Sequence, residues 1–266
     1  VVRPEGAAQI CLVGPPNAGK SHLHAELTGS HADIGPYPYT THVPMPGMLP
    51  YEDIHFQLVD LPPVSDDFME PWFVNAMQPA DGVLLVIDVA DPECLEQVPT
   101  VINRLAEKKI FLRSGWQGLD EAQDPDPDDM DDPFSLVLPA VLIANKSDLD
   151  PDPGEVETLE ELLGLRYPAL TVSAKTGDGL DTLGPFLFRA LEIVRVYTKT
   201  PGKPADNEKP FTVRRGDTVL DVARLVHKDI AENLKFARMW GTEVFDGQQV
   251  GPDHIVSDGD LVELHV

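Results

Sequence analysis

Apolar residues in this chain gather in short continuous runs that are separated by stretches with helical spacing. Such runs are typical of strands buried on both faces of a sheet. We expect strands at residues 10–13, 54–59, 82–89, 136–144 and 169–172. We expect helices at residues 21–27, 68–77, 95–108, 155–163 and 180–196. Because strands and helices alternate, the pattern predicts an α/β domain whose mostly parallel sheet carries helices on both faces.

The pattern changes near residue 198, where Pro201, Gly202 and Pro204 interrupt the helical spacing. We therefore expect a first domain at residues 1–197, a linker at 198–208 and a second domain at 209–266. In the second domain, the apolar spacing predicts a helix at 219–227 and strands at 211–213, 236–240 and 261–266. This mixture predicts a small α+β unit.

A stretch at about residues 114–133 of the first domain is rich in aspartate and broken by proline. It contains too few apolar residues to fold alone. We interpret it as a solvated surface insertion, and an acidic interaction segment is the alternative.

Composition places the chain among ordinary globular proteins, with 42% hydrophobic and 24% charged residues. No apolar run approaches the roughly 20 residues that a membrane-spanning helix needs, so we expect no membrane association. The two cysteines, Cys11 and Cys94, offer no disulfide framework, which favours a reducing, cytoplasmic setting. We also expect residues to precede Val1, because the chain does not begin with methionine.

The net charge is −25, with 45 acidic and 20 basic residues. Such a charge repels nucleic acids at long range and disfavours general binding of DNA or RNA. An acidic surface that keeps the protein in solution is the simpler interpretation. The eight histidines are scattered without metal-ligand spacing, so we expect them on the surface or in packing roles.

The first candidate site lies between the expected strand at 10–13 and the expected helix at 21–27. Its sequence, GPPNAGKS at residues 14–21, fits the phosphate-binding pattern G-x-x-x-x-G-K-[ST]. In such a loop, backbone N–H groups surround a phosphate, Lys20 adds positive charge near the β and γ phosphates, and the Ser21 hydroxyl coordinates Mg²⁺. The expected nucleotide-binding residues are Gly14, Pro16, Asn17, Ala18, Gly19, Lys20, Ser21 and His22.

Two further segments follow strands whose carboxyl ends meet the same edge of the sheet. In NKSD at 145–148, the Asp148 carboxylate has the geometry to accept hydrogen bonds from N1–H and the amino group of guanine, donors that adenine lacks there. A helix-capping turn is the alternative, but it does not explain the coincidence with the phosphate loop. In SAK at 173–175, a backbone N–H could face the guanine O6. We expect the base to be read by Asn145, Asp148 and Ala174, and the nucleotide to contact Lys146, Ser173 and Lys175 as well.

These three segments resemble those of GTP-binding proteins of the translation-factor-related class, in particular the Obg and developmentally regulated GTP-binding protein group. The resemblance covers residues 10–196 and implies a P-loop GTPase domain. The stretch YPYTT at 37–41 resembles the first switch of that family, in which a threonine completes the Mg²⁺ shell. By that likeness we expect Thr41 to be a metal ligand and a catalytic residue, with Thr40 as the second choice. Asp60 matches the family aspartate that holds Mg²⁺ through water.

From residue 211 onward the chain resembles a TGS domain, including DGDLVEL at 258–264. This resemblance implies a ubiquitin-like β-grasp fold and, in relatives, contact with ribosomes or RNA. A docking module without RNA contact is the alternative, because this segment has more acidic than basic residues.

Two positions depart from the family pattern. The pattern after Asp60 is D-x-x-G, but this chain has Pro63 in place of the glycine, and proline has no N–H to offer the γ-phosphate. Val64 stands where many relatives have a glutamine that orients water, so we expect slow hydrolysis. In related GTPases an asparagine at the position of Asn17 helps to hold a potassium ion, so we add Asn17 to the candidate catalytic residues, beside Lys20.

The sequence thus predicts an Mg²⁺-dependent GTPase that hydrolyses GTP to GDP and phosphate, as a slow switch linked to the ribosome or translation. The alternative, favoured by Pro63 and Val64, is a nucleotide-binding scaffold with little or no turnover that acts through its TGS domain. An ATP-using P-loop kinase or transporter subunit is disfavoured by Asn145 and Asp148.

Overall fold

The structure is a computed structural model, and it divides into two compact units. It describes residues 2–30, 43–119, 133–149, 161 and 163–266. One unit comprises Val1–Pro50 and Phe56–Phe186, and the other comprises Tyr51–His55 and Leu187–Val266. Within the described residues, no helix has the length and apolar character needed to cross a membrane.

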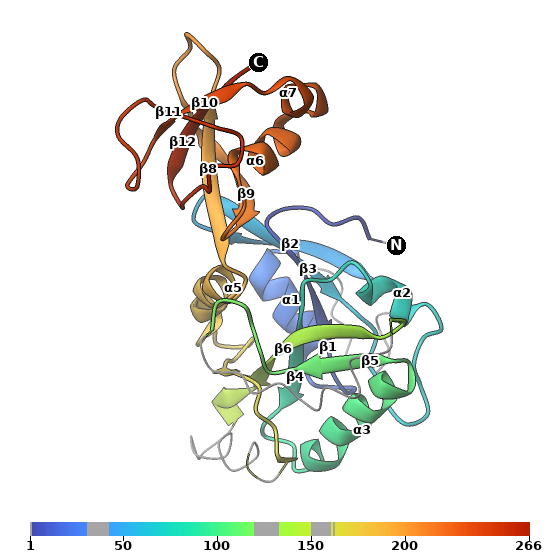
Figure 1. The fold of residues 1–266 in the computed structure, drawn as a ribbon. Coiled ribbons are helices and arrows are strands. Elements are labelled where there is room, and N and C mark those ends of the chain that lie inside the picture. The colour runs from blue at the N-terminus through green and yellow to red at the C-terminus, as the bar shows by residue number, and fades with distance from the viewer. Residues whose placement is uncertain (1, 31–42, 120–132, 150–160, 162) are drawn as a thin grey trace. The chain divides into compact units, whose positions relative to one another are not determined.

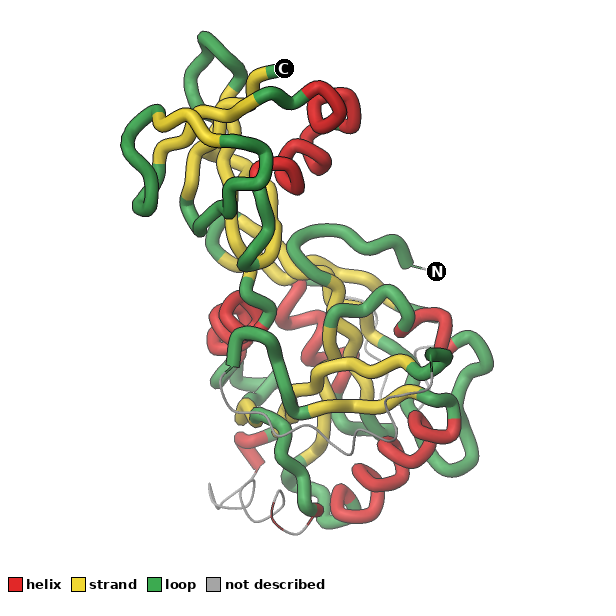
Figure 2. Tube along the Cα trace, viewed as in Figure 1, coloured by secondary structure: helices red, strands yellow, loops and turns green. Residues whose placement is uncertain are grey.

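The described part of the first unit contains a seven-stranded sheet (Figures 1 and 2). The strands are β1 (Gln9–Val13), β2 (Met45–Tyr51), β3 (Ile54–Asp60), β4 (Gly82–Asp88), β5 (Ile110–Arg113), β6 (Leu136–Asn145) and β7 (Ala169–Thr171). Their order is β2-β3-β1-β4-β6-β5, and β7 also pairs with β6. Strand β1 is parallel to β3 and β4, while β6 is parallel to β4, β5 and β7. The predicted α/β fold with a mostly parallel sheet is therefore confirmed.

Side chains on both faces of this sheet are buried. Val83, Leu85 and Ile87 of β4 belong to a core that includes residues of α2 and α3. Leu84 and Val86 point to the opposite face and are also fully buried. Burial at every position explains why these strands appear in the sequence as continuous apolar runs.

The helices of the first unit differ from the expected ones mainly at their ends. They are α1 (Lys20–Thr28), α2 (Phe73–Met77), α3 (Cys94–Glu107) and the start of α5 (Leu183–Ala190), whose residues from Leu187 belong to the second unit, with short 3-10 turns η2 (Ser147–Leu149) and η3 (Leu180–Thr182). Most of the helix expected at 155–163, and most of the acidic stretch at 114–133, lie outside the described residues. The helix expected to run to residue 196 ends at Ala190, and a strand begins at Ile193.

The second unit contains a five-stranded sheet in the order β11-β10-β12-β8-β9. Its elements are β8 (Ile193–Lys199), β9 (Asp206–Arg214), α6 (Val219–Val226), α7 (Lys228–Asn233), β10 (Phe236–Trp240), β11 (Gln248–Val250) and β12 (Asp260–His265). Strands β8 and β12 pair in parallel, and the other pairs are antiparallel. One face of the sheet packs on α6, whose Val219, Val222 and Ala223 are fully buried. The predicted small α+β fold is confirmed.

Strand β8 corrects the expected position of the boundary between the domains. It pairs with β9 and β12, so residues 193–199 belong to the second sheet, and the linker expected at 198–208 contains the end of β8 and the start of β9. The physical reason lies in the alternation of this strand: Val194 and Val196 are buried, whereas Arg195 and Tyr197 are only partly buried. Because the buried valines of β8 follow closely after the apolar residues of α5, the sequence pattern alone predicts one continuous helix through both segments.

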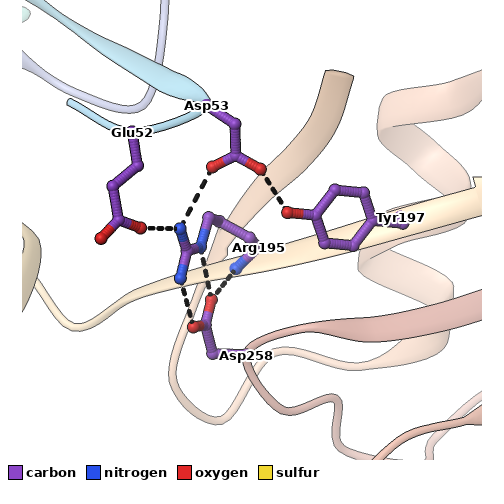
Figure 3. Close-up of polar contacts among 5 residues, drawn as sticks. All are labelled: Glu52, Asp53, Arg195, Tyr197 and Asp258. Carbon is purple, nitrogen blue, oxygen red and sulfur yellow. Dashed lines mark hydrogen bonds and ion pairs between the residues drawn. The ribbon is translucent and has the colours of Figure 1, made fainter. Parts of the chain in front are cut away.

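An arginine of β8 organises a cluster of acidic side chains within the second unit (Figure 3). The guanidinium of Arg195 donates to Asp258 at 3.0 and 2.8 Å and to Asp53 at 3.1 Å, and it also pairs with Glu52. The Tyr197 hydroxyl donates to the second oxygen of Asp53. Burial alone would raise the pKa of Asp53, but the hydrogen bonds from Tyr197 and Arg195 outweigh it and hold that pKa below its ordinary value. We call these five residues the Arg195 cluster.

Candidate functional site

The loop at 14–19 uses its two glycines for different steric reasons. A side chain at Gly14 would place its Cβ 2.2 Å from the carbonyl oxygen of Val86 on β4. Gly19 has a φ of +85°, and a Cβ there would lie 2.5 Å from Nδ2 of Asn145. Both positions therefore exclude larger residues, as a loop that wraps a phosphate requires.

Lys20 begins α1 and turns its side chain back over the loop. Its ammonium group donates to the carbonyl oxygens of Gly14 at 3.0 Å and Pro15 at 2.9 Å, and the residue is buried. Burial lowers the pKa of Lys20 to about 8, and the nearby Asp60 carboxylate partly offsets that effect. A phosphate group in the loop would offset it further, because a cation is favoured next to an anion.

Ser21 and Asp60 meet where α1 begins and β3 ends. The Ser21 hydroxyl donates to Oδ2 of Asp60 at 2.6 Å. A hydroxyl and a carboxylate are donors of the kind that Mg²⁺ prefers, since the ion takes oxygen ligands and usually binds one or two protein groups together with phosphate and water. Thr41 and Thr40, the other expected ligands, lie outside the described residues. Among the described residues, no cluster of three or more His, Cys, Asp or Glu side chains offers a different metal site.

Asn145 at the end of β6 links the phosphate loop to the segment at 173–175. Its Nδ2 donates to the carbonyl oxygen of Ala18 at 3.0 Å, and its Oδ1 accepts the backbone N–H of Ala174 at 3.1 Å. The side chain is buried, so these two bonds satisfy both ends of the amide. Asn145 thus braces two backbone segments, and the Ala174 N–H, expected to face guanine O6, is directed at Asn145 in this structure.

The next residue, Lys146, makes a second connection to the loop. Its ammonium group donates to the carbonyl oxygen of Asn17 at 2.8 Å and to Oδ2 of Asp88 at 2.6 Å. Asn145 and Lys146 therefore hold two consecutive carbonyl groups of the phosphate loop, those of Ala18 and Asn17.

Asp148 lies at the same edge with its carboxylate held in place. It accepts the Ser173 hydroxyl at 2.7 Å and pairs with the Lys175 ammonium at 3.3 Å. The Ser173 hydrogen bond is the largest cause of the shift, and together with the hydrogen bond and charge of Lys175 it outweighs burial and holds the pKa of Asp148 below its ordinary value. An ionised carboxylate has acceptor capacity for two donors on the edge of a base, which suits guanine.

Comparison with known proteins identifies both parts of the chain. Residues 9–113 match the family described as 50S ribosome-binding GTPase, and residues 194–266 match the TGS domain. The chain combines a GTPase domain with a TGS domain. The match to the TGS domain begins within β8, as the pairing of that strand also requires.

The relatives are similar to this chain over nearly its whole length. An uncharacterized GTP-binding protein of Methanocaldococcus jannaschii is 27% identical over 99% of this chain and 79% of its own length. The developmentally-regulated GTP-binding protein 1 of Xenopus laevis is 25% identical, and the ribosome-interacting GTPase 1 of Saccharomyces cerevisiae is 26% identical, each over 97% of this chain and 82% of its own length. These names confirm the predicted resemblance to GTP-binding proteins of the developmentally regulated group.

Two solved structures share the fold over nearly the whole chain. A GTP binding protein from Pyrococcus horikoshii has a TM-score of 0.61 and 17% identity, covering 97% of this chain and 99% of that one. The YchF GTPase of Schizosaccharomyces pombe has a TM-score of 0.65 and 12% identity, covering 99% of each chain. At these identities the likeness supports the fold alone.

Within the GTPase domain, the segment after Asp60 is fixed in the core. Leu61, Pro62, Pro63 and Val64 are all buried. The N–H of Leu61 donates to the carbonyl oxygen of Leu12 at 3.3 Å, and that of Val64 donates to Gly14 at 3.1 Å. The two prolines between these bonds fix φ and supply no N–H.

Two of the residues expected to bind the nucleotide, His22 and Asn17, lie in different surroundings. His22 lies beside Glu26 one turn along α1 at 3.6 Å, and both side chains are about 40% exposed, so the imidazole is engaged along the helix. Asn17 is exposed at the tip of the loop. Sequence reasoning missed Asp88, because an aspartate at the end of an apolar strand forms no recognisable pattern without its distant partner Lys146.

Proposed function

We propose that this protein is an Mg²⁺-dependent GTPase that hydrolyses GTP to GDP and phosphate slowly. The observation that carries the proposal is the Asn145 brace, which joins the phosphate loop at Ala18 to the base-reading segment at Ala174. Because one buried side chain links both segments, the loop and the ionised Asp148 lie at one edge of the sheet. That juxtaposition fits a guanine nucleotide, whose base and phosphates lie at opposite ends of one ligand.

The residues of the loop would act by positioning and by charge. Backbone N–H groups and the Lys20 ammonium would hold the β and γ phosphates, while Ser21 and Asp60 would hold Mg²⁺. Mg²⁺, when bound, neutralises charge on the phosphate oxygens. Asp148 would orient the nucleoside through the guanine edge. Such positioning lowers the barrier for attack of water on the γ-phosphate without a covalent step.

Slow turnover follows from the residues after Asp60. Val64 has no side-chain group to orient the attacking water, and its aliphatic side chain is fully buried. Thr41, a proposed ligand of Mg²⁺ and a catalytic residue, would come from the first switch. Asn17, exposed at the loop tip, is our candidate for holding K⁺ beside the transferred phosphate. Equal turnover in potassium and sodium buffers would overturn that role of Asn17.

A slow switch linked to the ribosome or to translation is the cellular role we propose. It is supported by the TGS domain and by the name of the yeast relative, ribosome-interacting GTPase 1. Residues 194–266 contain twelve acidic and ten basic residues, which favours contact with a protein over a general attraction to RNA.

A second candidate function, a nucleotide-binding scaffold with little or no turnover, is favoured by one observation. The Val64 N–H is bonded to Gly14, so the segment that moves in a switch is tied to the phosphate loop. A scaffold of this kind would act through its TGS domain in both nucleotide states.

The experiment that separates these functions is a titration of the full chain with fluorescent GDP and GTP analogues. Binding is measured with and without Mg²⁺ and in competition with GTP or ATP, and phosphate release is then followed in potassium and in sodium. We expect guanine-selective binding, tightened by Mg²⁺, with slow phosphate release. Selective binding without release would favour the scaffold, and equal competition by ATP would overturn guanine recognition.

A further inference from the structure

Asp88, the last residue of β4, holds a lysine of the guanine site in place. Its Oδ2 lies 2.6 Å from the Lys146 ammonium, and its Oδ1 accepts the backbone N–H of Ala90 at 3.0 Å. The bond to Ala90 fixes the carboxylate within its own turn, so the oxygen offered to Lys146 has a defined position. The Asp88 side chain is 14% exposed and that of Lys146 is 32% exposed, so water screens this ion pair only in part.

Lys146 uses a second donor to hold the phosphate loop. It bonds the carbonyl oxygen of Asn17 at 2.8 Å. Both residues have left-handed backbones, with φ of 65° at Lys146 and 61° at Asn17. Non-glycine residues adopt this conformation rarely and at a cost, so the surrounding contacts must maintain it. The bond between Lys146 and Asn17 is one such contact.

We propose that Asp88 is a positioning residue for nucleotide binding, which acts by holding Lys146 against the phosphate loop. A lysine side chain has a flexible stem and loses rotamer freedom when it is fixed. The Asp88 carboxylate draws the ammonium to one point, from which its other donor reaches Asn17. The loop is thereby pre-organised before nucleotide binds, and pre-organisation slows release of the ligand. This inference rests on the proposed function, since the ligand in question is a guanine nucleotide.

The test measures release of fluorescent GDP from the full chain when excess GDP is added. We expect Asp88→Ala and Asp88→Asn to release GDP about three to ten times faster, because each removes a charge-assisted bond that is partly screened by water. Asp91→Ala is the matched control: Asp91 lies three residues away and accepts the N–H of Glu93 at 2.9 Å, in the same kind of turn. Release from the Asp88 variants no faster than from Asp91→Ala would overturn the proposal.

A double-mutant cycle shows whether Asp88 acts through Lys146. We expect Lys146→Ala to speed release, and Asp88→Ala to add nothing in that background, because the held group is already gone. Fully additive effects would overturn the proposal even if each single change is large. Asp88→Glu keeps the charge and should restore part of the slow release, which a merely structural role of the turn would not require.

The unfolding midpoint without nucleotide is measured for each variant to detect misfolding. If Asp88→Ala lowers it strongly, Asp88→Asn, which keeps the size of the side chain, carries the comparison. Failure of the wild-type chain to bind GDP would contradict the proposed function, whereas normal wild-type binding with unaffected Asp88 variants would contradict only the role of Asp88.

Discussion

The backbone N–H of Val64 donates a 3.1 Å hydrogen bond to the carbonyl oxygen of Gly14. This bond joins the start of the phosphate loop to the segment where related GTPases carry their second switch. The intervening Pro62 and Pro63 restrict the backbone, and Val64 has no exposed surface. The segment is therefore built as part of the core, and we expect it to respond little to the nucleotide.

Replacing Pro63 with glycine should loosen this segment. Glycine adds backbone freedom to the unfolded chain, so Pro63→Gly should lower the free energy of unfolding by about 1 kcal/mol. Exchange of the Val64 N–H, followed by mass spectrometry, should become faster. In the wild-type chain, exchange of the Leu61 and Val64 N–H groups should be equal with GDP and with a GTP analogue. Pro204→Gly, at an exposed proline of the TGS domain, is the control. Faster wild-type exchange with one nucleotide than with the other would contradict a fixed second switch.

The central sheet and the phosphate loop could be predicted from sequence because their signals are local. Strands β1, β4 and β6 are apolar at nearly every position, and the spacing of Gly14, Gly19 and Lys20 is dictated by contact with phosphate. Strand β2 could not be predicted in this way. It contains Pro46, Gly47 and Pro50, and only Leu49 of its seven residues is buried, so it lacks the apolar pattern of a strand.

Other features depend on contacts between distant residues and leave no local signal. Asp88 and Lys146 are 58 positions apart, and only the pairing of β4 with β6 brings them together. The position of NKSD after an apolar strand placed Asn145 among the residues expected to read the base, but it could not reveal that both ends of its amide bond backbone groups. Such braces become visible only when the side-chain contacts are known.

Changing Asp148 to asparagine should change which base is bound. An amide has a donor where the carboxylate has an acceptor, so it opposes the amino group of guanine and suits the C2 carbonyl oxygen of xanthine. We expect Asp148→Asn to weaken GDP binding by roughly a hundredfold or more and to improve binding of xanthosine diphosphate, because a site built for hydrogen bonds rejects a mismatched partner strongly. Competition titrations would measure both. Asp178→Asn, at an exposed residue that bonds Thr176 at 2.7 Å, is the control. Unchanged base preference would contradict the proposed role of Asp148.

Changing Asn145 should weaken the GTPase domain even without nucleotide. Asn145→Ala leaves the buried carbonyl of Ala18 and N–H of Ala174 without this partner, which should cost about 1–3 kcal/mol in the free energy of unfolding. Asn145→Asp keeps the acceptor for Ala174 but loses the donor to Ala18, so it should also be destabilising. Urea unfolding of the nucleotide-free chain would measure these losses. Asn75→Ala, at an exposed position of α2, should change little. Equal stability of the Asn145 and Asn75 variants would show that the brace contributes nothing.

The Arg195 cluster should make the stability of the second unit depend on pH in acid. The pKa of Asp53 is held below its ordinary value of 3.8 in the folded chain, so the unfolded chain binds its proton more readily. The stabilisation is therefore present above pH 3.8 and is lost as the pH falls through the lowered, folded pKa. The hydrogen bond that Tyr197 donates to Asp53 also makes stability depend on pH in the alkaline range. It raises the pKa of Tyr197 to about 12, with burial as the second cause, so stability should be lost as the pH rises toward 12.

Arg195→Met should test this dependence, because it removes the cation and leaves Glu52, Asp53 and Asp258 to repel one another. We expect a lower urea midpoint for the second unit at neutral pH, followed through the NMR methyl signals of the buried Val196 and Val262. The loss of stability as the pH falls below 3.8 should be smaller than in the wild-type chain, because the pKa of Asp53 in the folded chain is no longer lowered by Arg195 and lies closer to its unfolded value. Arg215→Met is the control, since Arg215 is 77% exposed and pairs only with Glu192 among the ion pairs of the described residues. If stability falls in acid by as much in Arg195→Met as in the wild-type chain, the Asp53 carboxylate gains its stability from Tyr197 and not from the arginine.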